Sequence, residues 1–399
     1  MTKNNHQLLN RGVEQILPSQ KTLQNLMSKR KIRVYLGIDP TGSLLTLGHA
    51  VVLRKLQQFA DAGHDVILLI GNGTVKIGDP TGKDSTRPEL TDQQIEENFK
   101  NWKEQASKVL DFSKITIKHN GDWLDKMTMP EVIKLMAKVT VQQLMERDMF
   151  QERVKHNKPV HGHEIMYPML QGYDSVSMDV DLEIGGSDQL FNMMMGRVLQ
   201  KIYRDKEKWV LTTPIINGTD GRKMSKSYGN FIALTEDPAN MYGKLMSVSD
   251  NEILNYFRVL TDISDQELDS IEEKIKKGEN PMIFKKRLAL EITKWLHNDK
   301  LAKEAEAHFE KTVQGDNLPD KIPEIKIKTR QISLLELCQK AKSKESKSNL
   351  RRLISQGAVS VNGEKMIDDK DVLKIKSGGI LQIGKRNYFK LLVKSPNSR

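Results

Sequence analysis

The apolar run from Val66 to Ile70 constrains the fold more than any other segment of this chain. Five consecutive apolar residues indicate a strand buried on both faces, as occurs in parallel sheets. Strand-like and helix-like segments alternate around this run over the first 230 or so residues, which predicts an α/β domain with a parallel sheet. Thr91 and Gln94 have the spacing of a capping box at the start of a helix. The expected strands are 32–37, 66–70, 115–117 and 181–184, and the expected helices are 46–62, 91–110 and one that starts at 187.

The strand pattern ends after residues 1–235, and the rest of the chain falls into further predicted parts. Residues 236–318 are expected to be helical, and residues 319–331 to form a polar, proline-containing linker. Residues 332–399 are expected to form a small α+β module. The sequence therefore predicts three domains.

The net charge of +11 favours a polyanionic partner, because each neutralised phosphate releases counterions. An ordinary basic surface is the alternative explanation. No apolar run is long enough to span a bilayer, and residues 1–20 lack the apolar core of a secretion signal. Cys338 has no second cysteine to pair with, which fits a reducing cytosol. We expect a cytoplasmic protein that binds nucleic acid.

Two glycine-containing segments fail the common nucleotide-binding motifs. Residues 78–84 resemble part of a phosphate loop, but Ile77 stands where glycine is needed and Asp84 where Ser or Thr is needed. Residues 71–73 lack the third glycine of a dinucleotide fingerprint, because position 76 is Lys76.

Residues 37–49 follow a predicted strand and enter a predicted helix. A helix N-terminus presents unpaired N–H groups and a partial positive charge, which suits phosphate. Gly48 would let a ligand approach the first turn, and His49 could donate to a phosphate oxygen. A purely structural role for His49 remains the alternative.

Residues 223–227, with the sequence Lys-Met-Ser-Lys-Ser, lie between Gly221 and Gly229. A mobile basic loop of this kind can close on a triphosphate and stabilise the charge that develops on it. A solvated turn is the alternative.

Together, the two segments resemble the signature motifs of class I aminoacyl-tRNA synthetases. Residues 223–227 match the lysine-serine loop of that family, and residues 46–49 resemble its histidine motif, in the expected place after the first strand. The resemblance implies a Rossmann-like parallel-sheet catalytic domain in residues 1–235, an α-helical anticodon-region domain, and a small α+β RNA-binding domain.

Other segments resemble tyrosyl-tRNA synthetases in particular, and this resemblance runs over nearly the whole chain. The segments are residues 35–41, 167–174 and 185–189. The resemblance implies a phenol site of Tyr35 and Asp174, an ammonium site of Tyr167, Gln171 and Asp79, and contacts of Asp188 and Gln189 with the adenylate and the substrate.

The chemistry of these side chains agrees with the implied roles. A phenol hydroxyl both donates and accepts, so a carboxylate and a tyrosine hydroxyl can satisfy it. Phenylalanine would leave both unpaired, and the resulting discrimination, on the order of ten-thousandfold or more, is already known for tyrosyl-tRNA synthetases. Tyr167, Gln171 and Asp174 are spaced four and three residues apart, so they share one side of a helix. That spacing suits plain packing as well as a ligand site.

The implied reaction has two steps: the tyrosine carboxylate attacks the α-phosphate of ATP, and the acyl group then passes to the ribose at the 3′ end of tRNA(Tyr). Catalysis is expected to rest on positioning and charge stabilisation, with Mg²⁺ bridging the phosphates of ATP. The expected catalytic residues are Thr41, Thr46, His49, Lys223, Lys226 and Ser227, and the expected ATP contacts are Gly37, Asp39, Gly48, His49, Asp188 and Lys226.

Position 46 departs from the family pattern, which usually has histidine where this chain has Thr46. Threonine can donate one hydrogen bond but is shorter and cannot carry charge. We expect a working site with a weaker grip on the γ-phosphate, and we expect Thr46→His to raise the rate of adenylate formation.

The segment His161-Gly162-His163-Glu164 invites a zinc interpretation, but it lacks a partner pair nearby and its histidines are not one helical turn apart. No protein metal site is therefore predicted. In the C-terminal module, Asn362-Gly363 is a hairpin signal. Basic residues there favour RNA contact, with a solvated basic face as the alternative. They are Lys342, Lys344, Lys347, Arg351 and Arg352.

Two other interpretations remain open at this point. Tryptophanyl-tRNA synthetases share the architecture, although Tyr35 and Asp174 argue against them because indole only donates. A non-catalytic RNA-binding relative is favoured slightly by Thr46 and opposed by the loop 223–227. The family resemblance also implies a homodimer.

Overall fold

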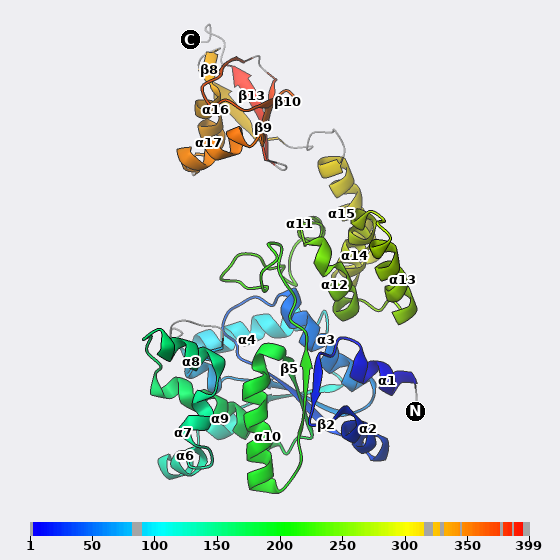
Figure 1. Ribbon diagram of the computed structural model, residues 1–399, viewed down its shortest axis with the longest axis vertical. Helices are drawn as coiled ribbons and strands as arrows, with labels where there is room; N and C mark the ends of the chain where they lie inside the picture. Colours follow the sequence, from blue (N-terminus) through cyan, green and yellow to red (C-terminus); the bar gives the residue numbers. More distant parts are fainter. Residues whose placement is uncertain are drawn as a thin grey trace. The chain divides into compact units, whose positions relative to one another are not determined.

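The computed structural model describes residues 3–81, 90–314, 322–327, 331–343, 345–375, 378–384 and 387–393. It divides into two compact units, Met1–Ala302 and Lys303–Arg399 (Figure 1). The predicted three-domain division stays a prediction, and part of its linker, with Gly82 to Asp84 and Lys344, lies outside the described residues.

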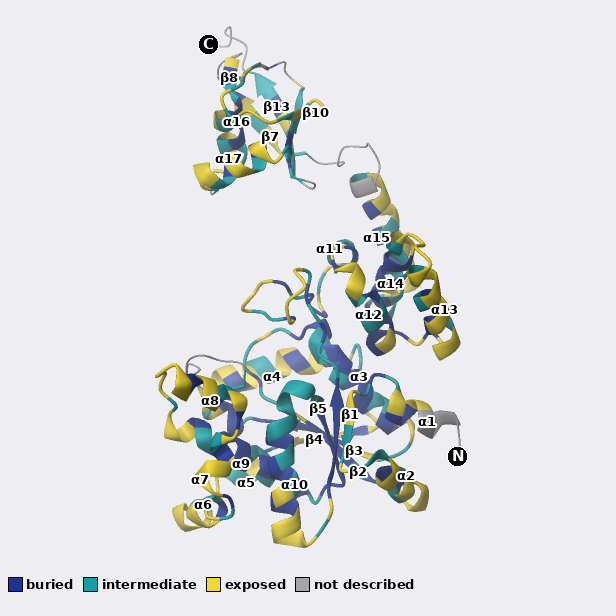
Figure 2. Cartoon of the chain, in the orientation of Figure 1, coloured by how far each residue is buried: buried dark blue, intermediate teal, exposed yellow. Residues whose placement is uncertain are grey.

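A six-stranded sheet forms the centre of the first unit, and its strands are largely buried (Figure 2). Its strands are β1 (Gln15–Leu17), β2 (Arg33–Ile38), β3 (Asp65–Ile70), β4 (Ile115–His119), β5 (Leu182–Gly186) and β6 (Trp209–Thr213). The spatial order is β1-β6-β5-β2-β3-β4. All neighbouring pairs are parallel except β1 with β6. The predicted parallel sheet and its four expected strands are confirmed, whereas β1 and β6 were not predicted.

The helices of this α/β part begin where the sequence signals predict. Thr46 caps one helix together with His49, and Thr91 caps the next by accepting a hydrogen bond from the Gln94 backbone N–H at 3.2 Å. The second of these ends four residues earlier than expected. The bounds are α1 (Lys3–Asn10), α2 (Gln20–Lys29), α3 (Leu47–Asp61), η1 (Thr74–Lys76), α4 (Asp92–Ala106), α5 (Gly121–Leu124), α6 (Met129–Met136), α7 (Val141–Met145), α8 (Asp148–Lys155), α9 (Gly162–Met178), η2 (Ser187–Gln189) and α10 (Leu190–Arg204).

A helical stretch follows, as predicted. Tyr242, Tyr256 and Phe257 are fully buried and form much of its core. The helices are α11 (Pro238–Leu245), η3 (Asp250–Glu252), α12 (Ile253–Leu260), α13 (Asp265–Lys276), α14 (Pro281–Leu296), α15 (Asp299–Phe309) and η4 (Glu310–Gln314).

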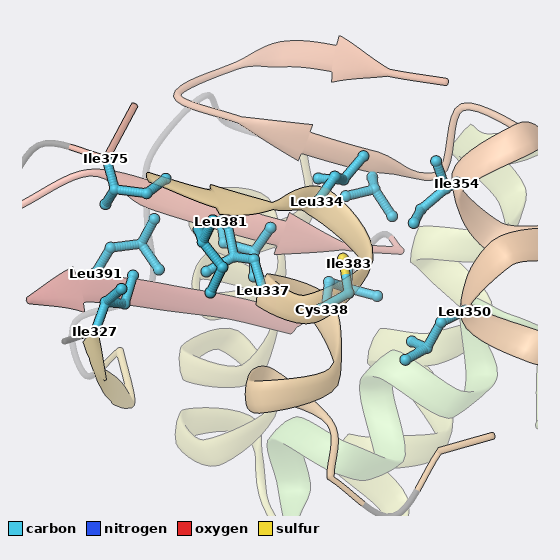
Figure 3. Close-up of a cluster of buried hydrophobic side chains, with 12 residues drawn as sticks. Ile327, Leu334, Leu337, Cys338, Leu350, Ile354, Ile375, Leu381, Ile383 and Leu391 are labelled. Atoms are coloured by element: carbon cyan, nitrogen blue, oxygen red, sulfur yellow. The ribbon is translucent and has the colours of Figure 1, made fainter. Parts of the chain in front are cut away.

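The C-terminal part has its own core (Figure 3). Cys338 lies within it, and burial raises the pKa of its thiol to about 12, so the thiol is unreactive. Asn362 and Gly363 both have positive φ and close the predicted hairpin. Five strands pair in the order β10-β9-β12-β13-β7, and β11 pairs with β8. The elements are β7 (Glu324–Ile327), β8 (Gln331–Ser333), α16 (Leu334–Ala341), α17 (Lys347–Ser355), β9 (Val359–Val361), β10 (Glu364–Met366), β11 (Val372–Lys374), β12 (Ile380–Ile383) and β13 (Asn387–Val393).

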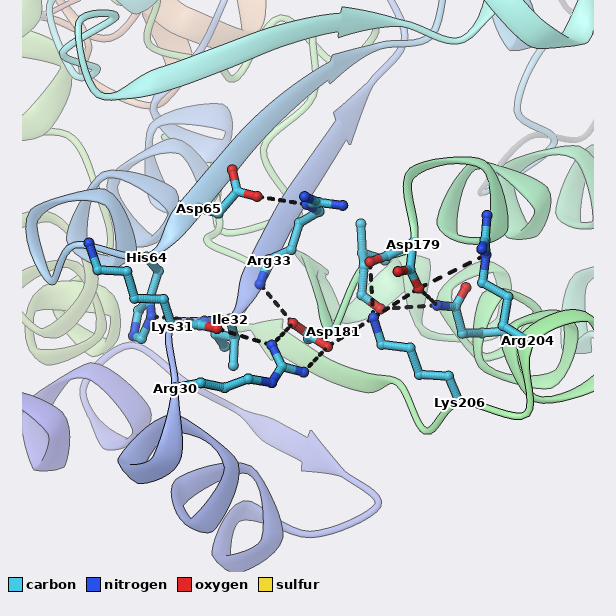
Figure 4. Close-up of polar contacts among 12 residues, drawn as sticks. Arg30, Lys31, Ile32, Arg33, His64, Asp65, Asp179, Asp181, Arg204 and Lys206 are labelled. Carbon is cyan, nitrogen blue, oxygen red and sulfur yellow. Dashed lines mark hydrogen bonds and ion pairs between the residues drawn. The ribbon is translucent and has the colours of Figure 1, made fainter.

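An ionic network ties together the amino ends of the central strands (Figure 4). The buried carboxylate of Asp181 accepts two hydrogen bonds from the Arg30 guanidinium, at 2.7 and 2.8 Å, and a third from the Arg33 backbone N–H. Lys206 adds an ion pair at 3.0 Å. Burial alone would raise the pKa of Asp181. The hydrogen bonds from Arg30, the Arg33 backbone and Lys206 outweigh it, so the pKa of Asp181 is lowered. The network lies away from the carboxyl ends of the strands.

Candidate active site

The sheet changes direction between β2 and β5. From β2 the chain passes through α3 to β3 on one side, whereas β5 pairs with β2 on the other side. In open α/β sheets, ligands bind at the carboxyl ends of the strands beside such a switch point. Asp39 directly follows β2, Asn120 directly follows β4, and Asp188 lies two residues beyond β5. The predicted site residues therefore come from the edge of the sheet where a ligand is expected.

Asp174 on α9 is a buried hydrogen-bond acceptor at this edge. Its carboxylate accepts from Asn120 Nδ2 at 3.1 Å and from the indole Nε1 of Trp123 at 2.9 Å. Burial raises the pKa of Asp174 well above its usual value, although both hydrogen bonds act in the opposite direction. The carboxylate is fixed in place and has further acceptor capacity for a ligand hydroxyl.

Tyr35 on β2 is fully buried, and its hydroxyl lies 3.0 Å from Ser175 Oγ. Burial raises the pKa of Tyr35 well above its usual value, and the charges of Glu183 and Asp174 add to the effect. The structure thus brings Tyr35 and Asp174 into electrostatic range of each other. It gives the Tyr35 hydroxyl a partner, Ser175, that the sequence did not indicate.

The hydroxyl of Tyr167 donates to Asp39 Oδ2 at 2.9 Å, and Thr74 donates to Asp39 Oδ1 at 2.8 Å. Gly71 makes this arrangement possible, because a Cβ there would lie 1.9 Å from Asp39 Oδ1. The Tyr167 hydroxyl donates its hydrogen bond to Asp39, so its oxygen can still accept a hydrogen bond from a ligand. The structure therefore links Asp39 to the residues predicted for the ammonium group.

Asp79 and Gln189 are joined directly, since Gln189 Nε2 donates to Asp79 Oδ2 at 2.9 Å. The guanidinium of Arg147 lies 3.6 Å from the other carboxylate oxygen, and Thr81 donates to that oxygen too. Burial lowers the pKa of Arg147, and the charge of Asp79 counteracts the effect. Two predicted ligand contacts thus share one hydrogen-bonded cluster.

His49 is neutral and oriented by Thr46. The Thr46 backbone N–H donates to His49 Nδ1 at 3.1 Å, and Thr46 Oγ1 lies 2.9 Å from the same nitrogen. Burial, with a smaller effect from Lys226, lowers the pKa of His49 to about 4. With Nδ1 acting as acceptor, Nε2 carries the proton and can donate to a phosphate oxygen without a positive charge.

The loop 223–227 lies beside the start of α3, so the two motifs meet. Lys223 Nζ pairs with Asp188 Oδ2 at 2.6 Å. Lys226 Nζ lies 5.8 Å from the ring centroid of Trp102, and that ring lies 5.9 Å from the ring of His49. Lys226 therefore lies close to His49 at the start of α3, whereas Lys223 is held by Asp188 just beyond β5.

Asn230, a residue that the sequence did not single out, holds this loop. It is buried, and its Oδ1 accepts from the Ser225 backbone N–H at 2.8 Å. Its Nδ2 donates to Asp220 Oδ1 at 2.6 Å and to the Lys223 carbonyl at 3.1 Å. These bonds fix the loop base, whereas Ser227 near its tip is exposed.

The remaining predicted positions lie nearby. Gly37 is in β2 and Gly48 in the first turn of α3. Thr41 donates its backbone N–H to the Asp39 carbonyl at 2.8 Å. Among residues absent from the sequence prediction, Asn120 could have been found because it ends an expected strand. The others carried no local signal: Thr74, Thr81, Trp123, Arg147, Ser175, Glu183, Lys208 and Asn230.

The segment considered for zinc has another partner. Glu164 is buried and accepts from the Arg153 guanidinium at 2.7 and 2.9 Å. Within the described part of the chain, no three His, Cys, Asp or Glu residues are grouped as a metal site would require.

Comparison with known proteins decides the family. A family model described as "tRNA synthetases class I (W and Y)" matches residues 27–314. The chain belongs to this family. A second model, "Tyrosine--tRNA ligase SYY-like C-terminal domain", matches residues 316–391.

Curated relatives of this synthetase carry the name tyrosine–tRNA ligase. The "Tyrosine--tRNA ligase" of Thermotoga maritima is 44% identical and covers 96% of each chain. The "Tyrosine--tRNA ligase 2" of Photorhabdus laumondii is 45% identical over 91% of this chain and 92% of its own. The predicted family, enzyme class and tyrosine ligase function are thereby confirmed, and the tryptophan alternative is not favoured.

Solved structures agree with the fold of the synthetase. Tyrosyl-tRNA synthetase of Archaeoglobus fulgidus, complexed with L-tyrosine, has a TM-score of 0.61 at 22% identity, covering 76% of this chain and 98% of its own. A C-terminally truncated mitochondrial tyrosyl-tRNA synthetase of Aspergillus nidulans has a TM-score of 0.63 at 18% identity, covering 77% of this chain and 93% of its own. Within the described residues, no helix of the synthetase has both the length and the apolar character needed to cross a membrane.

Thr46→Ala is expected to raise the barrier to adenylate formation by about 1–3 kcal/mol, because the change removes the hydroxyl that orients His49 through its Nδ1 atom. It should also cost about 0.5–2 kcal/mol of stability, since Thr46 caps α3. The measurements are ATP–pyrophosphate exchange and thermal unfolding. Thr46→Ser keeps the hydroxyl and should stay close to wild type; an equal loss in Thr46→Ser would contradict a role for the hydroxyl.

Proposed function

We propose that this synthetase activates tyrosine with ATP and transfers the tyrosyl group to the 3′ end of tRNA(Tyr). The observation that carries the proposal is the buried Asp174 carboxylate, held by Asn120 and Trp123 at the same sheet edge as the two phosphate-binding motifs. A carboxylate fixed in this way can accept a hydrogen bond from a phenol hydroxyl, and the motifs beside it suit a triphosphate.

Two groups of residues bind the two polar ends of the substrate tyrosine. Asp174 accepts the hydrogen bond of the phenol hydroxyl, and Tyr35 lies on the other side of the phenol. Tyr167, Gln171 and Asp79 hold the α-ammonium group, which has three donors and needs three acceptors. Support comes from Tyr167, whose hydroxyl has already donated to Asp39 and is left as an acceptor.

The α3 side and the loop side bind ATP between them. Thr41 and the neutral His49 Nε2 donate from the α3 side, where the Thr46 hydroxyl orients His49. Lys223 and Lys226 bring positive charge from the loop. Gly37, Gly48 and Asp39 line the approach, Asp188 and Gln189 contact the adenylate, and Ser227 assists from the loop.

Mg²⁺ would enter as a complex with ATP. An ion used in this way keeps most of its water and needs only one or two carboxylates. Asp188 could supply such a carboxylate, because it is partly exposed, and the ion would then replace Lys223, its present partner at 2.6 Å. The metal would reduce the charge repulsion between the phosphates and the attacking carboxylate.

No side-chain nucleophile is required, because the tyrosine carboxylate is already ionised. Its oxygen attacks the α-phosphorus, the bond to the bridging oxygen breaks, and pyrophosphate leaves. The ribose hydroxyl of tRNA then attacks the tyrosyl carbonyl and releases AMP. Catalysis comes from alignment and from the lysines that stabilise the transition-state charge.

ATP–pyrophosphate exchange tests the proposal directly. Purified chain with Mg²⁺ should incorporate labelled pyrophosphate into ATP when tyrosine is added, and not with tryptophan or without amino acid. Exchange stimulated by tryptophan alone would indicate a tryptophanyl-tRNA synthetase. No exchange at all would leave only an RNA-binding role.

The C-terminal part is proposed to bind tRNA. Arg352 and Lys347 lie on α17, and Arg351 pairs with Asp369. Basic side chains on a helix beside a small sheet suit an RNA backbone. Deletion after Lys321 should therefore spare tyrosine-dependent exchange and weaken tRNA charging. Charging unchanged by the deletion would contradict the assignment.

A homodimer in the cytoplasm is also proposed, on the family resemblance. Exposed apolar side chains on α6 and α7 are compatible with an interface, namely Met129, Ile133 and Val141. Sedimentation equilibrium should give twice the chain mass of 45.5 kDa. A mass equal to one chain would contradict the dimer.

A further inference from the structure

A buried ion pair lies directly behind the amino-acid site. Lys208, which precedes β6, has no exposed surface, and Glu183 on β5 is 2% exposed. Lys208 Nζ donates to Glu183 Oε2 and, at 3.0 Å, to the carbonyl of Met193. Gly196 on α10 makes room for the pair, because a Cβ there would lie 2.3 Å from Lys208 Nζ.

A pair of this kind adds little to stability. Removing two charges from water is costly, and apolar residues of similar size often serve as well or better. Burial lowers the pKa of Lys208, while the charge of Glu183 counteracts the effect. The pair holds the Glu183 carboxylate, a hydrogen-bond acceptor, in a buried place beside α9.

The second oxygen of Glu183 contacts Gln171 of α9. Gln171 Nε2 donates to Glu183 Oε1 at 3.2 Å. An ionised carboxylate only accepts hydrogen bonds, so the side-chain atom of Gln171 that faces Glu183 must be the NH₂ group. The carbonyl Oε1 of Gln171 must then point the other way. Within the described residues, that oxygen has no hydrogen-bond donor.

We infer that Glu183 and Lys208 are positioning residues that fix the amide of Gln171 with its oxygen toward the substrate ammonium group. Without an ionised Glu183, the amide could rotate by half a turn and present NH₂ to the ammonium, donor against donor. The pair also lies beside the phenol site, since Lys208 Nζ is 5.8 Å from the ring centroid of Tyr35. This inference rests on the proposed ammonium role of Gln171.

Ligands that differ in the ammonium group provide the test. Dissociation constants are measured for L-tyrosine, for tyramine, which keeps the ammonium, and for 3-(4-hydroxyphenyl)propionate, which lacks it. The variant Glu183→Met/Lys208→Leu removes both charges and the acceptor for Gln171, so that no buried charge is left unpaired. Tyrosine and tyramine should bind about tenfold or more weaker to it, the cost of a lost hydrogen bond to a charged group. The propionate should bind within about twofold of wild type.

A matched control is the other buried pair of this unit, Arg153 and Glu164, whose side chains are 3% and 2% exposed. Arg153→Met/Glu164→Gln should not distinguish the ammonium ligands from the propionate. If Glu183→Met/Lys208→Leu does not fold, as judged by thermal unfolding, the second apolar variant Glu183→Leu/Lys208→Met takes its place.

A thermodynamic cycle gives a second readout. In a Gln171→Met background, the change at Glu183 and Lys208 should have little further effect on tyrosine binding, because the amide it orients is gone. Equal weakening of all three ligands, additive losses in the cycle, or unchanged binding would each overturn the inference. Failure of wild type to bind tyrosine would instead overturn the proposed function.

Discussion

Asp174→Asn should lower kcat/KM for tyrosine in ATP–pyrophosphate exchange by on the order of a thousandfold. The change removes a charged acceptor for the phenol, worth about 1.5–3 kcal/mol. It also places an NH₂ group against Asn120 or Trp123, both of which donate to Asp174, and an unsatisfied buried donor costs a further 1–3 kcal/mol or so. The two terms together correspond to about that loss in rate.

The neighbouring exposed residue Asp122 provides the control. Asp122→Asn makes the same chemical change on α5 without touching the site and should keep wild-type kinetics. The KM for ATP should stay within about threefold in both variants, because Asp174 lies on the amino-acid side. A tenfold or smaller loss in Asp174→Asn would show that Asp174 does not bind the phenol.

Lys223→Ala/Lys226→Ala should reduce the kcat of tyrosine-dependent exchange by a factor on the order of 10³, while the dissociation constant of tyrosine stays near wild type. Removing a single group that stabilises transition-state charge costs about 10²–10³ in kcat, and the loop carries two. Tyrosine binding should survive because the pocket on α9 does not include the loop. The measurements are exchange kinetics and tyrosine binding in the absence of ATP.

Two checks accompany the loop variant. Lys201→Ala on α10 removes an exposed lysine paired with Asp205 and should leave kcat unchanged. Asn230→Ala should also reduce kcat, since it releases the loop base from four hydrogen bonds. A loop variant that loses less than about threefold in kcat would remove the lysines from the mechanism.

The elements that the sequence predicted well are those with a strong local signal. The apolar run 66–70 became β3, and the capping boxes at Thr46 and Thr91 start α3 and α4. The turn Asn362-Gly363 closes a hairpin. β1 was missed because three residues are too short to show alternation; it is a strand only because it pairs with β6.

The site was predicted as a set of positions, and its internal contacts were not. Resemblance supplied Asp39 as an ATP contact, but only the structure shows that it receives the Tyr167 hydroxyl. Trp123 lies in the four-residue helix α5 and Arg147 precedes α8 as its N-cap, and neither segment has a distinctive pattern. Glu183 lies within an expected strand, yet its link to Lys208 and Gln171 spans 25 and 12 residues, beyond any local periodicity.

The ionic network around Asp181 and the ligand-binding edge lie at opposite ends of the same strands. The anchors of the sheet therefore lie where no substrate comes, and side chains of the pocket can be exchanged without loosening these anchors. Altered amino-acid preference, whether it arises through evolution or through engineering for non-natural substrates, should then be reachable by substitutions on α9 and β2 that leave the melting temperature largely intact.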